Sequence, residues 1–311
     1  MNGVVIVDKP AGITSHDVVD RVRKLLGEKK AGHTGTLDPM ATGVLPVCIG
    51  EATKLASFLT GDDKVYEVTM RLGVRTDTQD MTGQVLAEQE PRVTEADVRE
   101  ALEAFSGRTI TQVPPQYSAV KVRGKALYKW ARKGIRVEPP ARQVEIRAIR
   151  VLGVEMPRVR FDVTCSKGTY VRTLCADVGE RLGCGAALET LRRTASGAFR
   201  LQDAVPLEGG SDAAIRERLE GAIIAPARAL AGVGDIPVPP HLEERLMQGH
   251  QPDAEALAGL QIPSLAAGDV VKFTSGSGRL VALARMVVAT EEIPMLGVRD
   301  RVARILRVFV P

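Results

Sequence analysis

One segment of this sequence reads Ala31-Gly32-His33-Thr34-Gly35-Thr36-Leu37-Asp38-Pro39-Met40-Ala41-Thr42-Gly43-Val44-Leu45-Pro46. It holds three glycines, three threonines and two prolines around a single carboxylate, that of Asp38. Glycine allows close backbone approach and positive φ, whereas proline fixes φ and lacks an N–H. This density predicts a shaped loop that presents Asp38 and His33, because catalytic groups often lie on loops held by a rigid scaffold. A compact connection with Asp38 as a turn former is equally compatible with the residues alone.

A strand and two helices are predicted around this segment. Val4–Val7 is a short apolar run typical of a buried strand. Thr14 and Asp17 have the spacing of a capping box, and apolar residues recur at helical intervals until Gly27. A helix is therefore expected to begin after Thr14 and to end at Gly27. Residues 51–59 are expected to form another helix.

Alternation of apolar and polar side chains from Tyr66 to Leu72 is typical of a half-buried strand. Taken alone, Tyr66 would be an ordinary core tyrosine of this strand. The turn-rich connection that follows carries Asp77 and Asp80. Both are conceivable metal ligands, but we favour side-chain capping of the turn.

The segment between residues 121 and 136 is uniformly basic. It has no acidic residue, and Tyr128 and Trp130 are interleaved with Lys121, Arg123, Lys125, Lys129, Arg132, Lys133 and Arg136. Basic side chains with aromatics suit a surface that tracks nucleic-acid phosphates. A solvated helix face would look similar. In combination with the Asp38 segment, we favour the RNA-binding interpretation.

A strand followed by a helix is predicted between residues 159 and 183. Apolar side chains alternate over residues 159–165, and the turn residues 166–169 then break the strand. Helical spacing of apolar residues resumes at Val171 and ends at Gly183. Tyr170 and Arg172 therefore fall at the start of a helix. Taken alone, Arg172 would be an exposed helix residue.

The composition changes after Ala204. Residues 206–240 are rich in Gly, Pro and Ala, with one helical pattern around residues 215–219. A second, smaller domain is predicted from about Ile236, with strands near residues 270–273, 280–284 and 302–310.

Composition places the chain among ordinary globular proteins. Its 311 residues allow about two domains, and its net charge of +4 is only weak support for an anionic partner. The four cysteines form no CxxC pair, so zinc is not expected and a metal site is not predicted. We find neither a signal peptide nor a membrane-spanning run. A reduced cytoplasm is the expected location.

Several segments resemble the signature of one family, the TruB transfer-RNA pseudouridine-55 synthases. The resemblance begins with Lys9-Pro10-x-Gly12-x-Thr14-Ser15 and continues through Lys30–Pro46. Further similar segments follow in order at residues 72–83, 113–121, 166–172 and 188–197. Together they cover nearly all of residues 1–200.

The resemblance implies an α/β (α+β) fold, with a mixed, mainly antiparallel sheet flanked by helices in a catalytic domain of residues 1–235. Residues 236–311 resemble the β-rich PUA RNA-binding domain that often ends TruB proteins. The implied activity is isomerisation of uridine-55 to pseudouridine in the T-loop of tRNA. The expected partner is the T-arm, without an obligate protein partner, and the chain is expected to be a monomer.

The resemblance also assigns roles to individual residues. It implies that Asp38 is the nucleophile, that Tyr66 stacks on the target base and that Arg172 partners Asp38. It implies that Tyr170 and Leu191 line the uridine pocket and that His33 contacts the RNA, although each would otherwise be a structural residue. Lys9 and Pro10 are expected to shape the loop rather than react. The RNA backbone is expected to contact Lys121, Arg123, Lys129 and Arg132.

The reaction cuts a C–N glycosidic bond, rotates the uracil and joins its C5 to the ribose. It involves no redox change, so no cofactor is expected. An ionised carboxylate suits a nucleophile that must leave again. Attack at C6 of the base and attack at C1′ of the sugar both remain open. A cation within about 4–6 Å would keep Asp38 ionised in a dry pocket, which predicts a buried Asp38–Arg172 pair.

Two other functions fit the same residues. A guide-RNA-dependent relative shares the nucleophile motif but works inside a ribonucleoprotein. An RNA-binding or RNA-folding protein would use the same surface, with catalysis as a secondary property.

Overall fold

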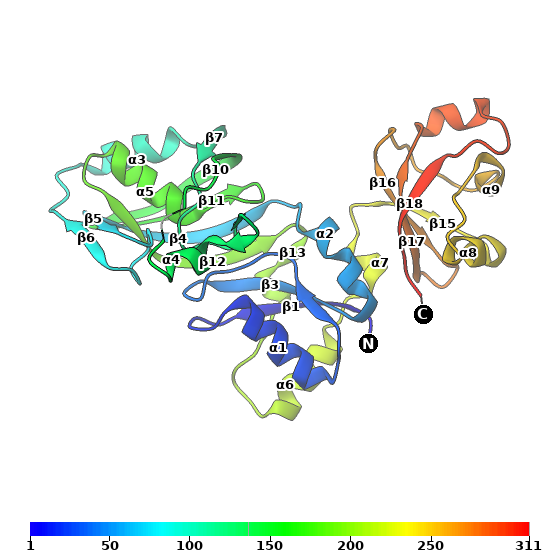
Figure 1. The fold of residues 1–311 in the computed structure, drawn as a ribbon, viewed down its shortest axis with the longest axis horizontal. Helices are drawn as coiled ribbons and strands as arrows, with labels where there is room; N and C mark the ends of the chain where they lie inside the picture. The colour runs from blue at the N-terminus through cyan, green and yellow to red at the C-terminus, as the bar shows by residue number, and fades with distance from the viewer. Residues whose placement is uncertain (136, 311) are drawn as a thin grey trace.

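The computed structural model describes residues 1–135 and 137–310, so Arg136 of the basic segment lies outside the described residues. Two sheets of unequal size form separate bodies along the long axis of the molecule (Figure 1). The larger body contains the Asp38 segment, and the smaller one contains the C-terminal strands. Both termini lie near the junction of the two bodies (Figure 1).

The larger sheet has ten strands, and eight of them run in the order β14-β1-β3-β12-β4-β11-β10-β7. Pairing is antiparallel except between β1 and β14 and between β3 and β12. The predicted mixed, mainly antiparallel sheet is thus confirmed. Its strands are β1 Gly3–Lys9, β2 Ala31–His33, β3 Thr42–Ile49, β4 Lys64–Leu72, β7 Arg108–Gln112, β10 Arg142–Glu155, β11 Arg158–Cys165, β12 Ala186–Ser196, β13 Phe199–Arg200 and β14 Val205–Pro206.

Helices flank this sheet where the sequence patterns place them. The first follows a capping box in which the Thr14 side chain accepts from Asp17 N, and it ends at Gly27 with φ +67°. The helix expected over residues 51–59 is instead a 3₁₀ helix followed by one α-helical turn. The helices of this body are α1 Ser15–Leu26, η1 Gly50–Leu55, α2 Ala56–Leu59, α3 Glu95–Glu103, α4 Leu127–Ala131, α5 Val171–Arg181, η2 Leu201–Asp203, α6 Asp212–Gly221 and α7 Pro226–Ala229.

The main core lies between the sheet and helices α1, α3, α5 and α6. Strand β4 contributes Tyr66, Val68, Met70 and Leu72 from one face, as its alternation predicts. Burial of this apolar surface is the chief source of stability for such a layered fold. The core therefore fixes β4 and β12, the two central strands that flank the site described below.

The expectation of a loop over all of residues 31–46 is wrong in part. Its ends form β2 and the start of β3, so only residues 34–41 are irregular. Gly43 explains the short loop, because it has φ +100° and lies against the backbone of Arg193 on β12. The glycine here lets β3 pair with β12 at close range.

Replacement of Gly43 by Ala is expected to lower the free energy of unfolding by about 3 kcal/mol, since strain and a backbone clash add together. A Cβ would lie 2.2 Å from the Arg193 carbonyl oxygen, and the residue would keep a positive φ. Urea unfolding measures the change. Gly32→Ala is the control, because a Cβ there meets nothing within 4 Å. Equal stability of the two variants would contradict this account of β3.

The smaller sheet has four strands in the order β15-β16-β17-β18 and a core of its own. The strands are β15 Gly234–Pro237, β16 Val270–Thr274, β17 Leu280–Met286 and β18 Ala303–Val308, with helices α8 Pro240–Met247, α9 Ala254–Leu257 and η3 Thr290–Met295. The strands expected near residues 270, 280 and 302 are present, and β15 adds a fourth. The two bodies touch through a mixed cluster that includes Leu55, Leu283 and Phe309.

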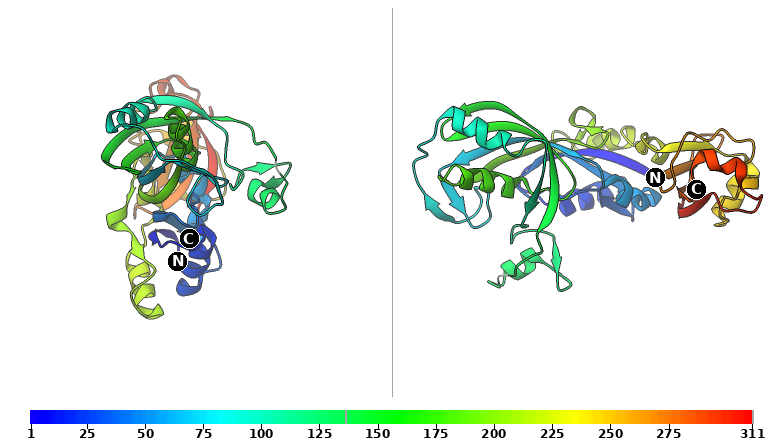
Figure 2. Two further views of the ribbon diagram at one scale, coloured as in Figure 1. Left: turned by 90° about the vertical axis from the view of Figure 1, so that its left-hand side faces the viewer. Right: turned by 90° about the horizontal axis from the view of Figure 1, so that it is seen from above.

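The basic segment projects from the larger sheet. It carries the short strands β8 Lys121–Val122 and β9 Lys125–Ala126 and the helix α4 on two connections to the sheet (Figure 2). A second hairpin, β5 Val74–Thr76 with β6 Val85–Glu88, flanks the sheet nearby. Among the described helices, none is long and apolar enough to cross a bilayer.

Candidate active site

A pocket of about 250 Å³ opens at the centre of the larger sheet, between the loop of residues 34–41, β4, the start of α5 and β12. Five residues singled out in the sequence line it together: Asp38, Tyr66, Tyr170, Arg172 and Leu191. They come from four separate stretches of the chain, which only the folded sheet brings together.

Asp38 and Arg172 form an ion pair in this pocket. The Asp38 Oδ2 atom lies 2.9 Å from Arg172 Nε, although the N–H is not aligned well enough for a regular hydrogen bond. The Arg172 side chain is 4% exposed, whereas that of Asp38 is 32% exposed. The predicted pairing is confirmed; its cation is almost fully buried, whereas its carboxylate is only partly buried. The carboxylate faces the open pocket, where a ligand can reach it.

Arg172 is held by further partners on both sides. Its Nη1 donates to Thr78 O at 3.1 Å and its Nη2 donates to Tyr117 O at 2.9 Å. Its Nη1 also lies 3.6 Å from Oδ2 of the buried Asp80. One buried guanidinium thus connects two carboxylates with two loops, and its position is fixed before any ligand binds.

Asp77 and Asp80 cap the turn between β5 and β6. Asp80 Oδ1 accepts from the Thr78 and Thr82 hydroxyls, and Asp77 Oδ1 accepts from Gln84 N. The turn-capping interpretation is confirmed. In the described part of the chain, no group of three His, Cys, Asp or Glu side chains is arranged to hold a metal ion. The contact of Asp80 with Arg172 was not predicted.

Burial and charge act in opposite directions on Asp38. Burial raises the pKa of this carboxyl and outweighs the neighbouring Arg172, which lowers it, while Asp80 raises it further. Without Arg172 the ionised form would be less favourable still. The pair therefore keeps a carboxylate available in a site that disfavours charge.

Side-chain hydrogen bonds to its backbone carbonyls hold the loop that carries Asp38. The buried Lys9 Nζ donates to Ala41 O at 2.7 Å and to Pro39 O at 3.2 Å, and the Ser15 hydroxyl donates to Leu37 O. Burial lowers the pKa of Lys9 to about 8. These bonds to loop carbonyls support the expectation that Lys9 shapes the loop.

Tyr66 and Tyr170 form the aromatic part of the pocket. Tyr66 is buried on β4, and burial raises the pKa of its phenol above the ordinary value, so at neutral pH it is protonated. Tyr170 is half-buried, and the Arg142 guanidinium lies 5.4 Å from its ring centre. Two aromatic rings beside a carboxylate suit a planar base.

His33 does not line the pocket. It is the last residue of β2, and its Nδ1 accepts from Gly35 N at 3.3 Å. Burial, with Arg193 nearby, lowers the pKa of its imidazole. The structure therefore places a neutral histidine on the loop beside the pocket rather than in it.

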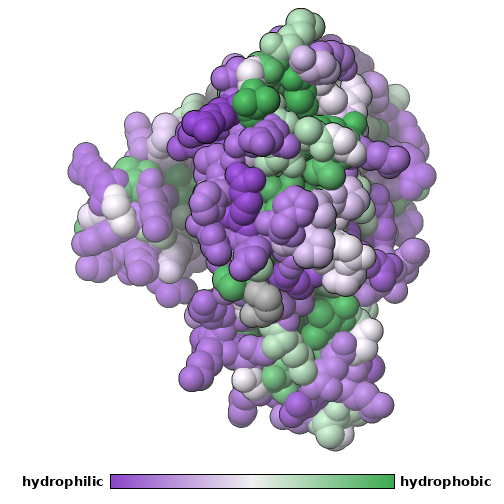
Figure 3. Space-filling view, turned by 90° about the vertical axis from the view of Figure 1, so that its right-hand side faces the viewer, coloured by the Kyte–Doolittle hydropathy of each residue, from purple (hydrophilic) through white to green (hydrophobic). Residues whose placement is uncertain are grey.

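The predicted backbone-binding residues lie on the projecting segment: Lys121, Arg123, Lys129 and Arg132. All four are exposed, and none has a carboxylate within 4 Å among the described residues. Tyr128 and Trp130 lie under Arg132 and Lys125, respectively. The segment is strongly hydrophilic and stands out at the left of Figure 3. Ser118 and Ala119, which lie just before this segment in the chain, line the pocket.

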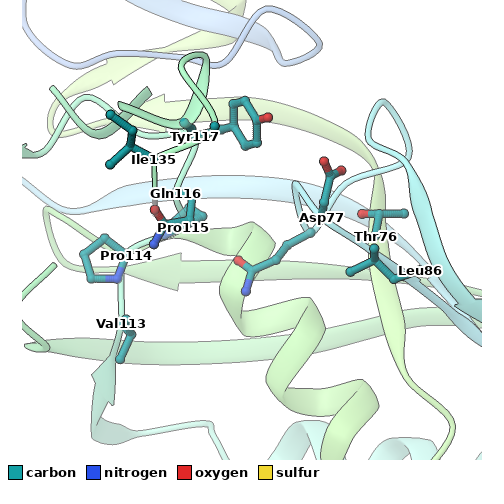
Figure 4. A pocket seen from close by; sticks show the side chains of 12 residues that line it. Thr76, Asp77, Leu86, Val113, Pro114, Pro115, Gln116, Tyr117 and Ile135 are labelled. Carbon is teal, nitrogen blue, oxygen red and sulfur yellow. The ribbon is translucent and has the colours of Figure 1, made fainter. Parts of the chain in front are cut away.

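A second pocket of about 470 Å³ lies between the β5–β6 hairpin and the base of the basic segment. Tyr117, Asp77 and Leu86 border it from different elements (Figure 4). Tyr117 joins it to the first pocket, because its carbonyl accepts from Arg172. This pocket was not predicted, because the residues that form its walls lie far apart along the chain.

Two further cations of the first pocket were missed in the sequence. Arg193 is almost fully buried on β12, and Lys64 is buried at the start of β4. Lys64 Nζ donates to Thr60 O at 2.8 Å. The sequence offers no clear signal for either residue, because both strands carry other charged residues, such as Glu67 on β4 and Arg192 on β12.

Comparison with known proteins gives consistent results. The family profile "TruB family pseudouridylate synthase (N terminal domain)" matches residues 23–171, and "tRNA pseudouridylate synthase B C-terminal domain" matches residues 172–230. A tRNA pseudouridine synthase B from Syntrophus aciditrophicus is 49% identical over 99% of both chains. One from Geobacter sulfurreducens is 47% identical over 85% of this chain and 88% of its own.

Two solved structures have the same fold. A chain of a Cbf5-Nop10-Gar1 complex has a TM-score of 0.75 and 29% identity, covering 99% of this chain and 85% of that one. A chain of an H/ACA RNP bound to a substrate RNA containing 2′-deoxyuridine has a TM-score of 0.75 and 26% identity, with the same coverage.

Proposed function

Because this chain belongs to the TruB family of pseudouridylate synthases, we propose that it isomerises uridine-55 in the T-loop of tRNA to pseudouridine. The observation that carries the proposal is the Asp38–Arg172 ion pair at the mouth of a pocket lined by Tyr66 and Tyr170. The relatives from two bacteria that match most of the chain are named for tRNA pseudouridine synthesis.

Asp38 is the nucleophile in this proposal. Arg172 keeps its carboxylate ionised and aimed at the pocket, where a target nucleoside would lie. Tyr66 stacks on the uracil, and Tyr170 and Leu191 enclose the nucleoside. The reaction is an internal rearrangement without oxidation or reduction, so the residues of the pocket suffice without a cofactor.

A uridine in a folded loop must leave its stack to reach this pocket, which costs a few kcal/mol. An aromatic platform recovers about 1–3 kcal/mol per base. The exposed basic segment would contact the T-arm backbone, and His33 would contact the loop from which the base is withdrawn. Residues 236–311 would act as a PUA-like RNA-binding domain. The proposed enzyme is a cytoplasmic monomer without an obligate protein partner.

Incubation of the purified chain with unmodified tRNA, followed by mapping of pseudouridine, tests the proposal. We expect modification at position 55 alone, and none in a tRNA with cytidine at that position. Modification elsewhere would overturn the site assignment. A requirement for an added guide RNA would favour the ribonucleoprotein alternative, which the likeness to a chain of an H/ACA RNP raises. The sequence identity to tRNA pseudouridine synthase B, 49%, is higher than the identity to these fold neighbours, which argues for activity on bare tRNA.

Neutralising the basic segment is expected to weaken tRNA binding uniformly. A variant with Lys121, Arg123, Lys129 and Arg132 changed to Gln should lower the slope of log K against log salt by about 3, because each phosphate contact releases counterions. Fluorescence anisotropy at several salt concentrations measures this. The control changes four ion-paired basic residues, Arg21, Arg23, Arg99 and Arg216. If both variants have the same slope of log K against log salt, the RNA does not bind at the basic segment.

A further inference from the structure

Arg193 is the largest fully buried side chain of the described residues, and it lies in the proposed uridine pocket. Its Nε donates to Val44 O at 2.7 Å and its Nη2 donates to Gly35 O at 3.1 Å. Over the described part of the chain, no carboxylate lies within 4 Å of it, whereas Arg172 has two. Burying a charge without a counterion is costly, so its retention points to a function.

The neighbour of Arg193 across the sheet is Tyr66. The two residues are directly opposite in the pairing of β12 with β4, so their side chains share one face. Both side chains line the same pocket, and the nearby positive charge of Arg193 opposes the effect of burial, which raises the phenol pKa. A phenol oxygen that accepts from a guanidinium keeps its own proton for donation.

We propose that Arg193 is a positioning residue that holds the Tyr66 hydroxyl as a hydrogen-bond donor to the uracil once the detached base leaves its stacked position and rotates. This inference rests on the proposed function. When the C1′–N1 bond breaks, its electron pair stays on the detached uracil, and the charge spreads to the carbonyl oxygens. A donor already aimed at such an oxygen in a dry pocket stabilises the charge without reorganisation.

The step balances without an oxidant or reductant. The C1′–N1 bond breaks and a C1′–C5 bond forms, while C5 loses a proton and N1 gains one. Tyr66 does not itself need to ionise, because it donates a hydrogen bond rather than transferring its proton. Burial raises the pKa of its phenol, so the hydroxyl keeps its proton at neutral pH.

A purely structural role for Arg193 would lie in its bonds to Val44 and Gly35, which brace the loop. If its role were only structural, replacing Arg193 would lower the rate by the same factor whether or not the Tyr66 hydroxyl is present. A double-mutant cycle between the two residues therefore separates the alternatives. The measurements are the single-turnover rate of pseudouridine formation and the dissociation constant of tRNA.

Arg193→Gln and Tyr66→Phe are each expected to lower the rate by about 100-fold, the usual loss of one preorganised donor. In the Tyr66→Phe background, Arg193→Gln should cost no more than about threefold further. The tRNA dissociation constant should stay within about threefold of wild type, since the donor acts on the reaction rather than on binding. Arg193→Lys should restore part of the rate because it keeps a cationic donor.

Arg192→Gln is the matched control. This neighbour lies on the opposite face of β12 and pairs with Asp8 at 2.8 Å, half exposed, so its loss should change the rate less than about threefold. If the wild type is active and the two rate losses simply add in the double variant, the inference about Arg193 is overturned but the proposed function is not. An inactive wild type would overturn the proposed function as well. If Arg193→Gln does not fold, the same cycle with Arg193→Lys decides.

Discussion

Asp38→Asn is expected to abolish pseudouridine formation, lowering the single-turnover rate by at least about 10⁴-fold, as for removal of other catalytic nucleophiles. The amide has nearly the shape of the carboxylate but cannot attack and then leave. Arg172 would keep Asp80, Thr78 and Tyr117 as partners, so the pocket should stay folded. Quenched-flow sampling with wild-type and variant protein at saturating tRNA measures the rate.

The control for this variant is Asp212→Asn, which removes an exposed carboxylate that pairs with Arg21. Its rate should match wild type. The tRNA dissociation constant of Asp38→Asn should change little, because its side chain is a small part of the RNA surface. A variant that retains both the rate and the modification would remove Asp38 from the mechanism. If cells need the protein but tolerate Asp38→Asn, RNA binding or folding is its main role.

The segments with a regular period were predicted correctly. The alternation of β4, the capping box of α1 and the apolar stripe of α5 each follow from local physics that tertiary packing reinforces. The ion pair between residues 38 and 172 was also predicted, although through the family resemblance. Nothing in the local patterns joins a loop near the N-terminus to a helix more than a hundred residues later.

Strand β12 shows why other parts were missed. Its pairing with β4 shifts register between Leu188 and Thr190 and again between Arg193 and Ala195. Each irregularity disturbs the period of two, so the apolar alternation is lost in the sequence. The long strand β10 carries two similar shifts against β11. Bulges of this kind often lie beside active sites, and here they accompany Leu191 and Arg193 in the pocket.

Arg193 itself could not be assigned from the sequence. Its surroundings depend on β3, whose start was expected to be a loop because the segment is rich in glycine. They also depend on Tyr66, its cross-strand partner 127 positions earlier in the chain. A charged residue in a strand usually indicates the solvent face. Here Arg193 faces inward and Arg192 faces outward, which the sheet register alone decides.

Arg172→Met is expected to reduce both stability and rate, because it leaves Asp38 and the buried Asp80 without their cation. Breaking a buried pair typically lowers the free energy of unfolding by about 3–5 kcal/mol. The single-turnover rate should fall by about 10³-fold, since the nucleophile loses its charge partner and its orientation. Urea unfolding at neutral pH and quenched-flow sampling measure the two effects. Arg158→Met is the control, as it removes an exposed pair with Glu189 that contributes little.

The pH dependence of Arg172→Met distinguishes charge from packing. Arg172 lowers the pKa of Asp38, so without it the pKa, already raised by burial, moves higher. Only the ionised carboxylate reacts, so the acid limb of the rate profile should shift to higher pH. Carboxyls whose pKa is higher in the folded than in the unfolded protein take up protons on folding, so acid stabilises the folded form. The stability deficit of the variant should therefore shrink as the pH falls, whereas a packing defect would leave it constant.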